Sequence, residues 1–128
     1  MNLEQLISEM MTMNTKARLW HWMTDTAQHH TTFEQFLTQN EVHTDSFVES
    51  SLGNEWPLKL SSIGVLSGVC KTYSIGDARS ELKSYRGAVI EIKKSLEDSD
   101  KIGSDELVTV LDGVVELTSK TLYLLNLK

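Results

Sequence analysis

The sequence predicts a single all-α domain, a bundle of four main helices that takes up residues 1–128. Apolar residues recur every three or four positions over four long segments, which is the spacing that gives a helix one buried face. Glycine and proline are scarce outside residues 53–76, so little interrupts those segments. With 128 residues, of which 40% are hydrophobic, the chain is long enough for one packed core.

The first helix is predicted over residues 3–23 and the second over residues 26–52. The apolar stripe of the first helix consists of Leu3, Leu6, Ile7, Met10, Met11 and Ala17. Four positions after Ala17 this stripe reaches His21, which is therefore expected to face the bundle interior. Asp25 and Gln28 have the spacing of a capping box, and Gly53 is a typical C-terminal stop.

The apolar face of the second helix is thin for its length. It consists of Phe33, Leu37 and Phe47, with Phe36 at its edge. The third helix is predicted over residues 77–96 and the fourth up to Leu125, with Ser104 as its N-cap. Their inward residues are Leu82, Tyr85, Val89, Ile92 and Leu96, then Leu107, Val110, Leu111, Val114 and Leu117.

Residues 53–76 form a connection that is too long for an ordinary bundle turn, with room for a short helix around residues 63–69. Two helices, a long crossover and two further helices give the topology of ferritin-like four-helix bundles. The rival at the level of fold is an irregular helical domain that buries its thin second helix against a partner chain.

The charge pattern narrows the classes of partner. The net charge is −6 and the basic residues are scattered, which disfavours nucleic acid as a ligand. No apolar run is long enough to span a membrane, and the first residues do not resemble a signal peptide. The one cysteine, Cys70, is expected to be a buried thiol, and together these features favour a cytoplasmic location.

The second helix carries a repeated pattern of possible metal ligands. Glu34 follows His30 by four residues, Glu49 follows Asp45 by four, and Asp45 follows Glu34 by eleven. Both pairs therefore lie on one side of the helix, about 16 Å apart at about 1.5 Å per residue, too far to bind one ion within one chain. Antiparallel packing of two copies of this helix brings His30 and Glu34 of one chain near Asp45 and Glu49 of the other. Imidazoles and carboxylates together are suited to Fe(II) and similar divalent metals.

The segment Leu19-Trp20-His21-Trp22, followed by this pattern of His, Glu, Asp and Glu, resembles the Dps proteins of the ferritin-like superfamily. It is also similar to small phage-encoded proteins described as distant Dps relatives. The resemblance covers about residues 15–53 and implies an iron site that two subunits share and that oxidises Fe(II), which makes the protein a candidate ferroxidase. The implied metal ligands are His21, His30, Glu34, Asp45 and Glu49.

The chain departs from the Dps pattern in ways that leave alternatives open. The interval from His21 to His30 is short for the family, so His29 is the substitute ligand, and there is no lysine-rich tail for DNA. His43 is on another face of the second helix and is expected to be exposed. The leading hypothesis is an iron-binding homodimer or larger homo-oligomer in the cytoplasm, or in the host cytoplasm if it is phage-encoded. The alternative is a non-catalytic ferritin-like module that binds a protein partner.

Overall fold

A computed structural model describes residues 1–65 and 72–127 of the chain. Its long helices are α1 (Leu3–Met23), α2 (Ala27–Gly53), α3 (Ile75–Glu97) and α4 (Ser104–Leu125). One turn of 3₁₀ helix, η1 (Leu60–Ser62), lies between α2 and α3. No strand occurs in the described residues, so the predicted all-α four-helix bundle is confirmed.

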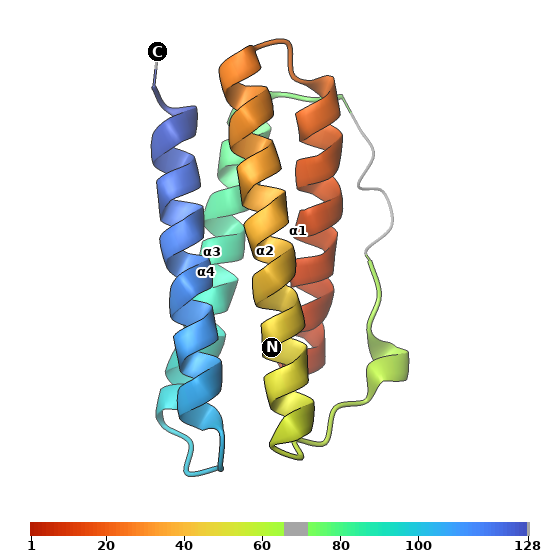
Figure 1. Ribbon diagram of the computed structural model, residues 1–128, viewed down its shortest axis with the longest axis vertical. Coiled ribbons are helices and arrows are strands. Elements are labelled where there is room, and N and C mark those ends of the chain that lie inside the picture. The colour runs from red at the N-terminus through yellow and green to blue at the C-terminus, as the bar shows by residue number, and fades with distance from the viewer. Residues whose placement is uncertain (66–71, 128) are drawn as a thin grey trace.

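The helices form two antiparallel pairs, α1 with α2 and α3 with α4 (Figure 1). Helix α2 ends at one end of the bundle and α3 begins at the other, so α2 and α3 point in the same direction (Figure 1). In addition, α1 packs on α3 and α2 packs on α4. This is the order expected for a ferritin-like bundle with one long crossover.

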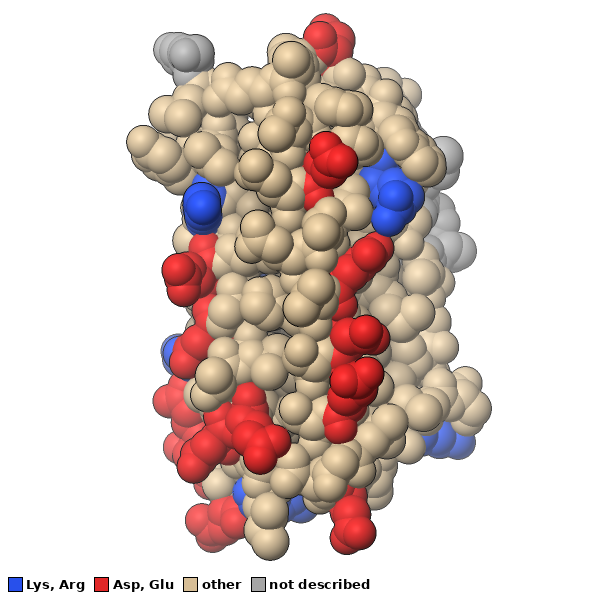
Figure 2. Space-filling model, in the orientation of Figure 1, with Lys and Arg blue, Asp and Glu red and all other residues tan. Residues whose placement is uncertain are grey.

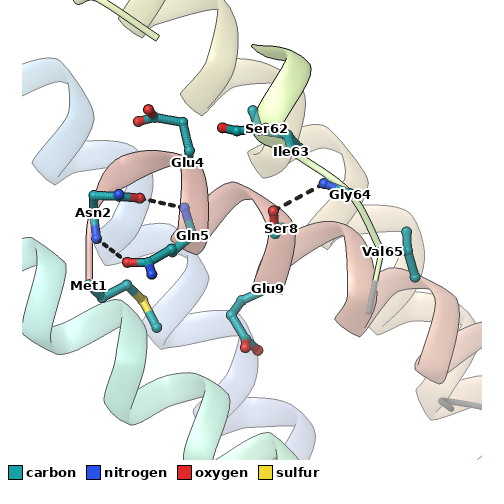
Figure 3. A pocket seen from close by; sticks show the side chains of 10 residues that line it. All are labelled: Met1, Asn2, Glu4, Gln5, Ser8, Glu9, Ser62, Ile63, Gly64 and Val65. Carbon is teal, nitrogen blue, oxygen red and sulfur yellow. Dashed lines mark hydrogen bonds between the residues drawn. The ribbon is translucent and has the colours of Figure 1, made fainter. Parts of the chain in front are cut away.

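The long connection lies beside the first turns of α1. The backbone N–H of Gly64 donates to Ser8 Oγ at 3.2 Å, which fixes this stretch against α1 (Figure 3). The short helix predicted around residues 63–69 is not found where it can be judged, because Ile63 and Val65 are not helical. Leu66, Val69 and Cys70 lie outside the described residues.

Two of the predicted helix caps are wrong by one residue. The N-cap of α2 is Thr26, whose Oγ1 accepts from the N–H of His29, and not Asp25. Gln28 instead donates from Nε2 to the carbonyl of Leu124 on α4, a contact between distant parts of the chain. The N-cap of α4 is Gly103, with φ of 90°, and the predicted cap Ser104 is the first helical residue.

The core confirms most of the predicted inward residues and corrects the stripe of α1. Leu6, Ile7, Met10 and Ala17 are buried, whereas Met11 is 37% exposed. Met13 and Trp20 fill the interior in its place, so after Met10 the stripe advances in steps of three, four and three. On α2, Phe36 is completely buried rather than lying at an edge. The predicted inward residues of α3 are buried, and Val110 of α4 is partly buried.

A buried amide completes the thin apolar face of α2. Asn40 is fully buried, and its Nδ2 donates to Asn14 Oδ1 at 2.8 Å. Its Oδ1 accepts from the hydroxyl of Tyr85 on α3 at 2.8 Å. Burial raises the pKa of Tyr85, which keeps this hydroxyl protonated and able to donate. Asn40 thus joins α1, α2 and α3 in the centre of the bundle, and the irregular fold considered as a rival is not formed.

Candidate metal centre

His21 was predicted to face the bundle interior, but it does not. Because the apolar stripe steps from Ala17 by three to Trp20, the large indole takes the inward position. His21, one residue further on, lies half-buried at the edge of α1 that faces α2. This edge position leaves its imidazole accessible to solvent on one side.

His21 and His30 hold one another through a pair of reciprocal hydrogen bonds. His21 Nδ1 lies 2.8 Å from the carbonyl oxygen of His30, and His30 Nδ1 lies 2.7 Å from the carbonyl oxygen of His21. A carbonyl oxygen only accepts, so each Nδ1 must carry the hydrogen and each Nε2 is left with a lone pair in the neutral ring. The two rings stack with centroids 3.8 Å apart at 24°.

Local structure explains why the His21 carbonyl is an acceptor. His21 is in the last turn of α1, where backbone carbonyls lack a partner within the helix, and the His30 ring supplies that partner. His30 is in the first turn of α2, and the short connection between the helices brings the two ends together. The imidazole pair therefore clips the end of the α1–α2 hairpin while it fixes both tautomers.

Glu34 completes a group of three possible ligands. It follows His30 by one turn on α2 and is exposed. One ligand atom each from His21, His30 and Glu34 lies within 4.8 Å of the other two. Once both Nδ1 hydrogens are committed to carbonyls, the groups that remain are two lone pairs and a carboxylate, and all of them are acceptors. A cation satisfies such a group once the two stacked rings turn so that both Nε2 lone pairs point at it, and two imidazoles with one carboxylate form the ligand set known from non-haem Fe(II) sites.

The other predicted ligands are not brought to this group within one chain. Asp45 and Glu49 are exposed on α2, toward its C-terminal end. Along the helix, Asp45 is about 16 Å from Glu34 at about 1.5 Å per residue. Figure 2 shows acidic side chains in a column along the face where α2 lies. Whether a second copy supplies these two carboxylates stays a prediction.

His29, the alternative ligand, is not a member of the group that the described residues form. Its ring meets the edge of Phe33, with centroids 6.4 Å apart, and its backbone N–H is bound by the Thr26 cap. Trp20, next to His21, is a packing residue, since its ring lies 5.5 Å from that of Phe33. Trp22, by contrast, is 65% exposed and does not belong to the core.

His43 is half-buried against α4, which contradicts the expected exposed position. A Cβ atom at Gly113 would lie 2.7 Å from His43 Cε1, so the absence of a side chain on α4 makes room for the ring. Burial lowers the pKa of His43. Glu116 and Lys120 of α4 line the same shallow depression of about 230 Å³.

We expect His43 to make stability fall as the pH drops below about 6.5, its value in an unfolded chain. Below that pH the histidine of the unfolded chain binds a proton more readily than the native ring, whose pKa is lower. Protonation therefore favours unfolding. Urea denaturation of the unaltered chain and of His43→Gln at several pH values measures the effect, and the variant should show a shallower slope. His29→Gln is the matched control. Equal slopes in the unaltered chain and His43→Gln would contradict this expectation.

Sequence reasoning missed what orients the two imidazoles. A metal-binding histidine needs an acceptor for the ring nitrogen that does not bind the metal. Here the acceptors are the backbone carbonyls of His21 and His30 themselves. Backbone groups leave no signal in the sequence, although two histidines that flank a short helix connection are a clue to such a clip.

No protein-family model matches this chain, and no curated protein and no solved structure matches it either. None of the helices in the described part of the chain is both long enough and apolar enough to cross a membrane.

Proposed function

We propose that this protein binds Fe(II) through His21, His30 and Glu34. The observation that carries the proposal is the reciprocal pair of hydrogen bonds, which leaves Nε2 of both imidazoles as the nitrogen available to a metal. Metal-binding histidines generally donate a hydrogen bond from the N–H of the second ring nitrogen to a carbonyl or carboxylate in this way. The nearby Glu34 carboxylate adds an anionic oxygen ligand, which attracts a divalent cation.

The same ligand set is suited to oxidation of the iron. Three protein ligands leave coordination positions open for dioxygen or peroxide, which take up electrons from Fe(II). Asp45 and Glu49 of a second copy would add carboxylates, whose negative charge stabilises Fe(III) relative to Fe(II). The Dps-like spacing of these residues and the bundle topology support this reading, and the function we propose is that of a Dps-like ferroxidase.

We expect His21→Ala to weaken Fe(II) binding at least about tenfold, because even changes behind the ligands cost about 10–100-fold in metal affinity. Binding is measured by calorimetry under anaerobic conditions, and oxidation is then followed by ferric absorbance after peroxide is added. His29→Ala is the matched control, since it removes a neighbouring imidazole that is outside the group.

Equal affinities in His21→Ala and His29→Ala would contradict the proposed site. Iron binding with no excess of oxidation over the protein-free rate would leave a binding site and remove the ferroxidase. A chain that binds no Fe(II) but is isolated from its source cells in a stable complex would favour the alternative, a module that binds a protein.

A further inference from the structure

The outward face of α2 carries negative charge that the folded chain does not neutralise. Glu34, Glu41, Asp45 and Glu49 are all exposed along this helix. Of these four, only Glu41 forms an ion pair within the described residues, with Arg18 at 3.2 Å. Figure 2 shows the acidic column with few basic side chains beside it.

The ligand positions on α2 have a symmetry that one chain does not use. The midpoint between His30 and Glu49 and the midpoint between Glu34 and Asp45 coincide, between residues 39 and 40. A two-fold axis through that point, with two antiparallel α2 helices, therefore sets His30 opposite the partner copy's Glu49 and Glu34 opposite its Asp45 in one register. Two equivalent clusters result, one at each side of the axis.

The surface near this midpoint is suited to close approach of a second copy. Thr38 and Gln35 are exposed and uncharged, and Val42 is an apolar side chain that is 61% exposed. Glu41 is also exposed near this midpoint, and its charge is paired with Arg18 at 3.2 Å. Among the described helices α2 packs on α1 and α4, which leaves its outward face uncovered.

We propose that metal controls the association of two copies of this chain through α2, an inference that rests on the proposed function. Without metal, the approach of the two helices sets the Glu34 carboxylate opposite the partner copy's Asp45 with Glu49 close by, and like charges in direct opposition oppose contact. A divalent cation held by His21, His30 and Glu34 reverses the sign of each cluster and attracts the partner copy's Asp45 and Glu49. The acidic residues of α2 thus keep the metal-free chain monomeric. Once a cation is bound by His21, His30 and Glu34, this group is positively charged and complementary to the partner copy's Asp45 and Glu49.

The first test is the mass of the protein in solution with and without metal. Sedimentation velocity and native mass spectrometry of the full chain are run anaerobically with excess EDTA and then with Fe(II). We expect a monomer in EDTA and a dimer that carries one Fe(II) per chain after loading. Asp45→Asn/Glu49→Gln should lose this metal-dependent shift, because it retains the histidines and lacks the partner carboxylates. Asp100→Asn/Glu116→Gln removes two exposed acidic groups from other parts of the surface and should dimerise like the unaltered chain.

The second test is complementation between two defective variants. His21→Ala/Glu34→Gln lacks one half of the site and Asp45→Asn/Glu49→Gln lacks the other, so neither should dimerise with Fe(II). Mixed together, they should form a heterodimer with one intact site, which native mass spectrometry identifies as a single iron on the mixed species.

The outcomes separate the two proposals. A monomer that binds one Fe(II) without associating would overturn the metal-controlled dimer and leave the iron site. A dimer that persists unchanged in EDTA, or a mixture of the two variants that forms no iron-bound heterodimer, would also overturn it. A chain that binds no Fe(II) would overturn the proposed function itself.

Discussion

Replacement of Asn40 by aspartate is expected to cost about 3–5 kcal/mol at neutral pH, because it leaves an unpaired charge in the centre of the bundle. Asn40 is fully buried, and its Nδ2 donates to Asn14 Oδ1 and to the carbonyl of Met10. A carboxylate has no hydrogen for these two acceptors, so the Asn40→Asp variant sets oxygen against oxygen. Only the hydrogen bond from the Tyr85 hydroxyl can survive the change.

The pH dependence of Asn40→Asp has a definite sign. Burial raises the native pKa of the new carboxyl group above its unfolded value of about 3.9. At pH values between the unfolded and the native pKa of this carboxyl group, the native state holds a proton that the unfolded state has released. Stability should therefore fall as the pH rises, by about 1.4 kcal/mol per pH unit within that window.

Urea denaturation followed by circular dichroism between about pH 4 and pH 8 measures this slope. Asn40→Leu is the matched control, because it removes the same hydrogen bonds without adding a titratable group. It should cost about 1–3 kcal/mol for the unpaired Tyr85 hydroxyl, with no added dependence on pH. If the free energies of unfolding of Asn40→Asp and Asn40→Leu differed by a constant amount across the pH range, the site around residue 40 would be accessible to water.

The sequence was sufficient for the helices because their periodicity is a local property. Leu82, Tyr85, Val89 and Ile92 of α3 repeat at steps of three and four, and all are buried as predicted. On α1 the same rule failed at Met11, which is exposed, and at His21, since steps of three and of four are both helical and Ala17 leads equally to Trp20 or His21. The structure chooses Trp20 because the larger apolar surface gains more from burial.

Two further errors came from contacts between residues far apart in the chain. Asp25 and Gln28 fit a capping box, but Gln28 binds the Leu124 carbonyl of α4 instead. His43 is half-buried because Gly113, on another helix, leaves space for its ring. No pattern within α2 contains that information.

The candidate site shows the same division. The spacing of His30 and Glu34 on one helix was enough to place them on one face, and the group of three with His21 exists. The reciprocal bonds to backbone carbonyls required the geometry of the α1–α2 connection. Asp45 and Glu49 can join this group only from a second chain, so neither the sequence nor a single folded chain determines their role.

Removal of the Phe33 ring should have the largest effect on the end of the bundle that holds the metal centre. Phe33 is fully buried, with ring centroids 5.5 Å from Trp20 and 6.0 Å from Tyr73. Phe33→Ala is expected to cost about 3–5 kcal/mol, the range for large-to-small changes of a buried aromatic residue. Total stabilities of domains are about 5–15 kcal/mol, so the variant should be close to unfolding, with a Tm lower by on the order of 10–20 °C.

The loss should extend to the candidate metal centre, because Trp20 and Phe33 hold α1 against α2 beside the two histidines. Even at a temperature where Phe33→Ala is folded, the cavity should loosen the His21–His30 clip and weaken Fe(II) binding. Thermal denaturation and anaerobic calorimetry at about 10 °C measure the two effects separately. Phe36→Ala is the matched control, since Phe36 is equally buried but its ring meets Tyr85 instead of Trp20. It should lower stability to a similar degree and leave the affinity for Fe(II) nearly unchanged. If both variants lost affinity equally, the packing of Trp20 on Phe33 would have no specific part in shaping the site.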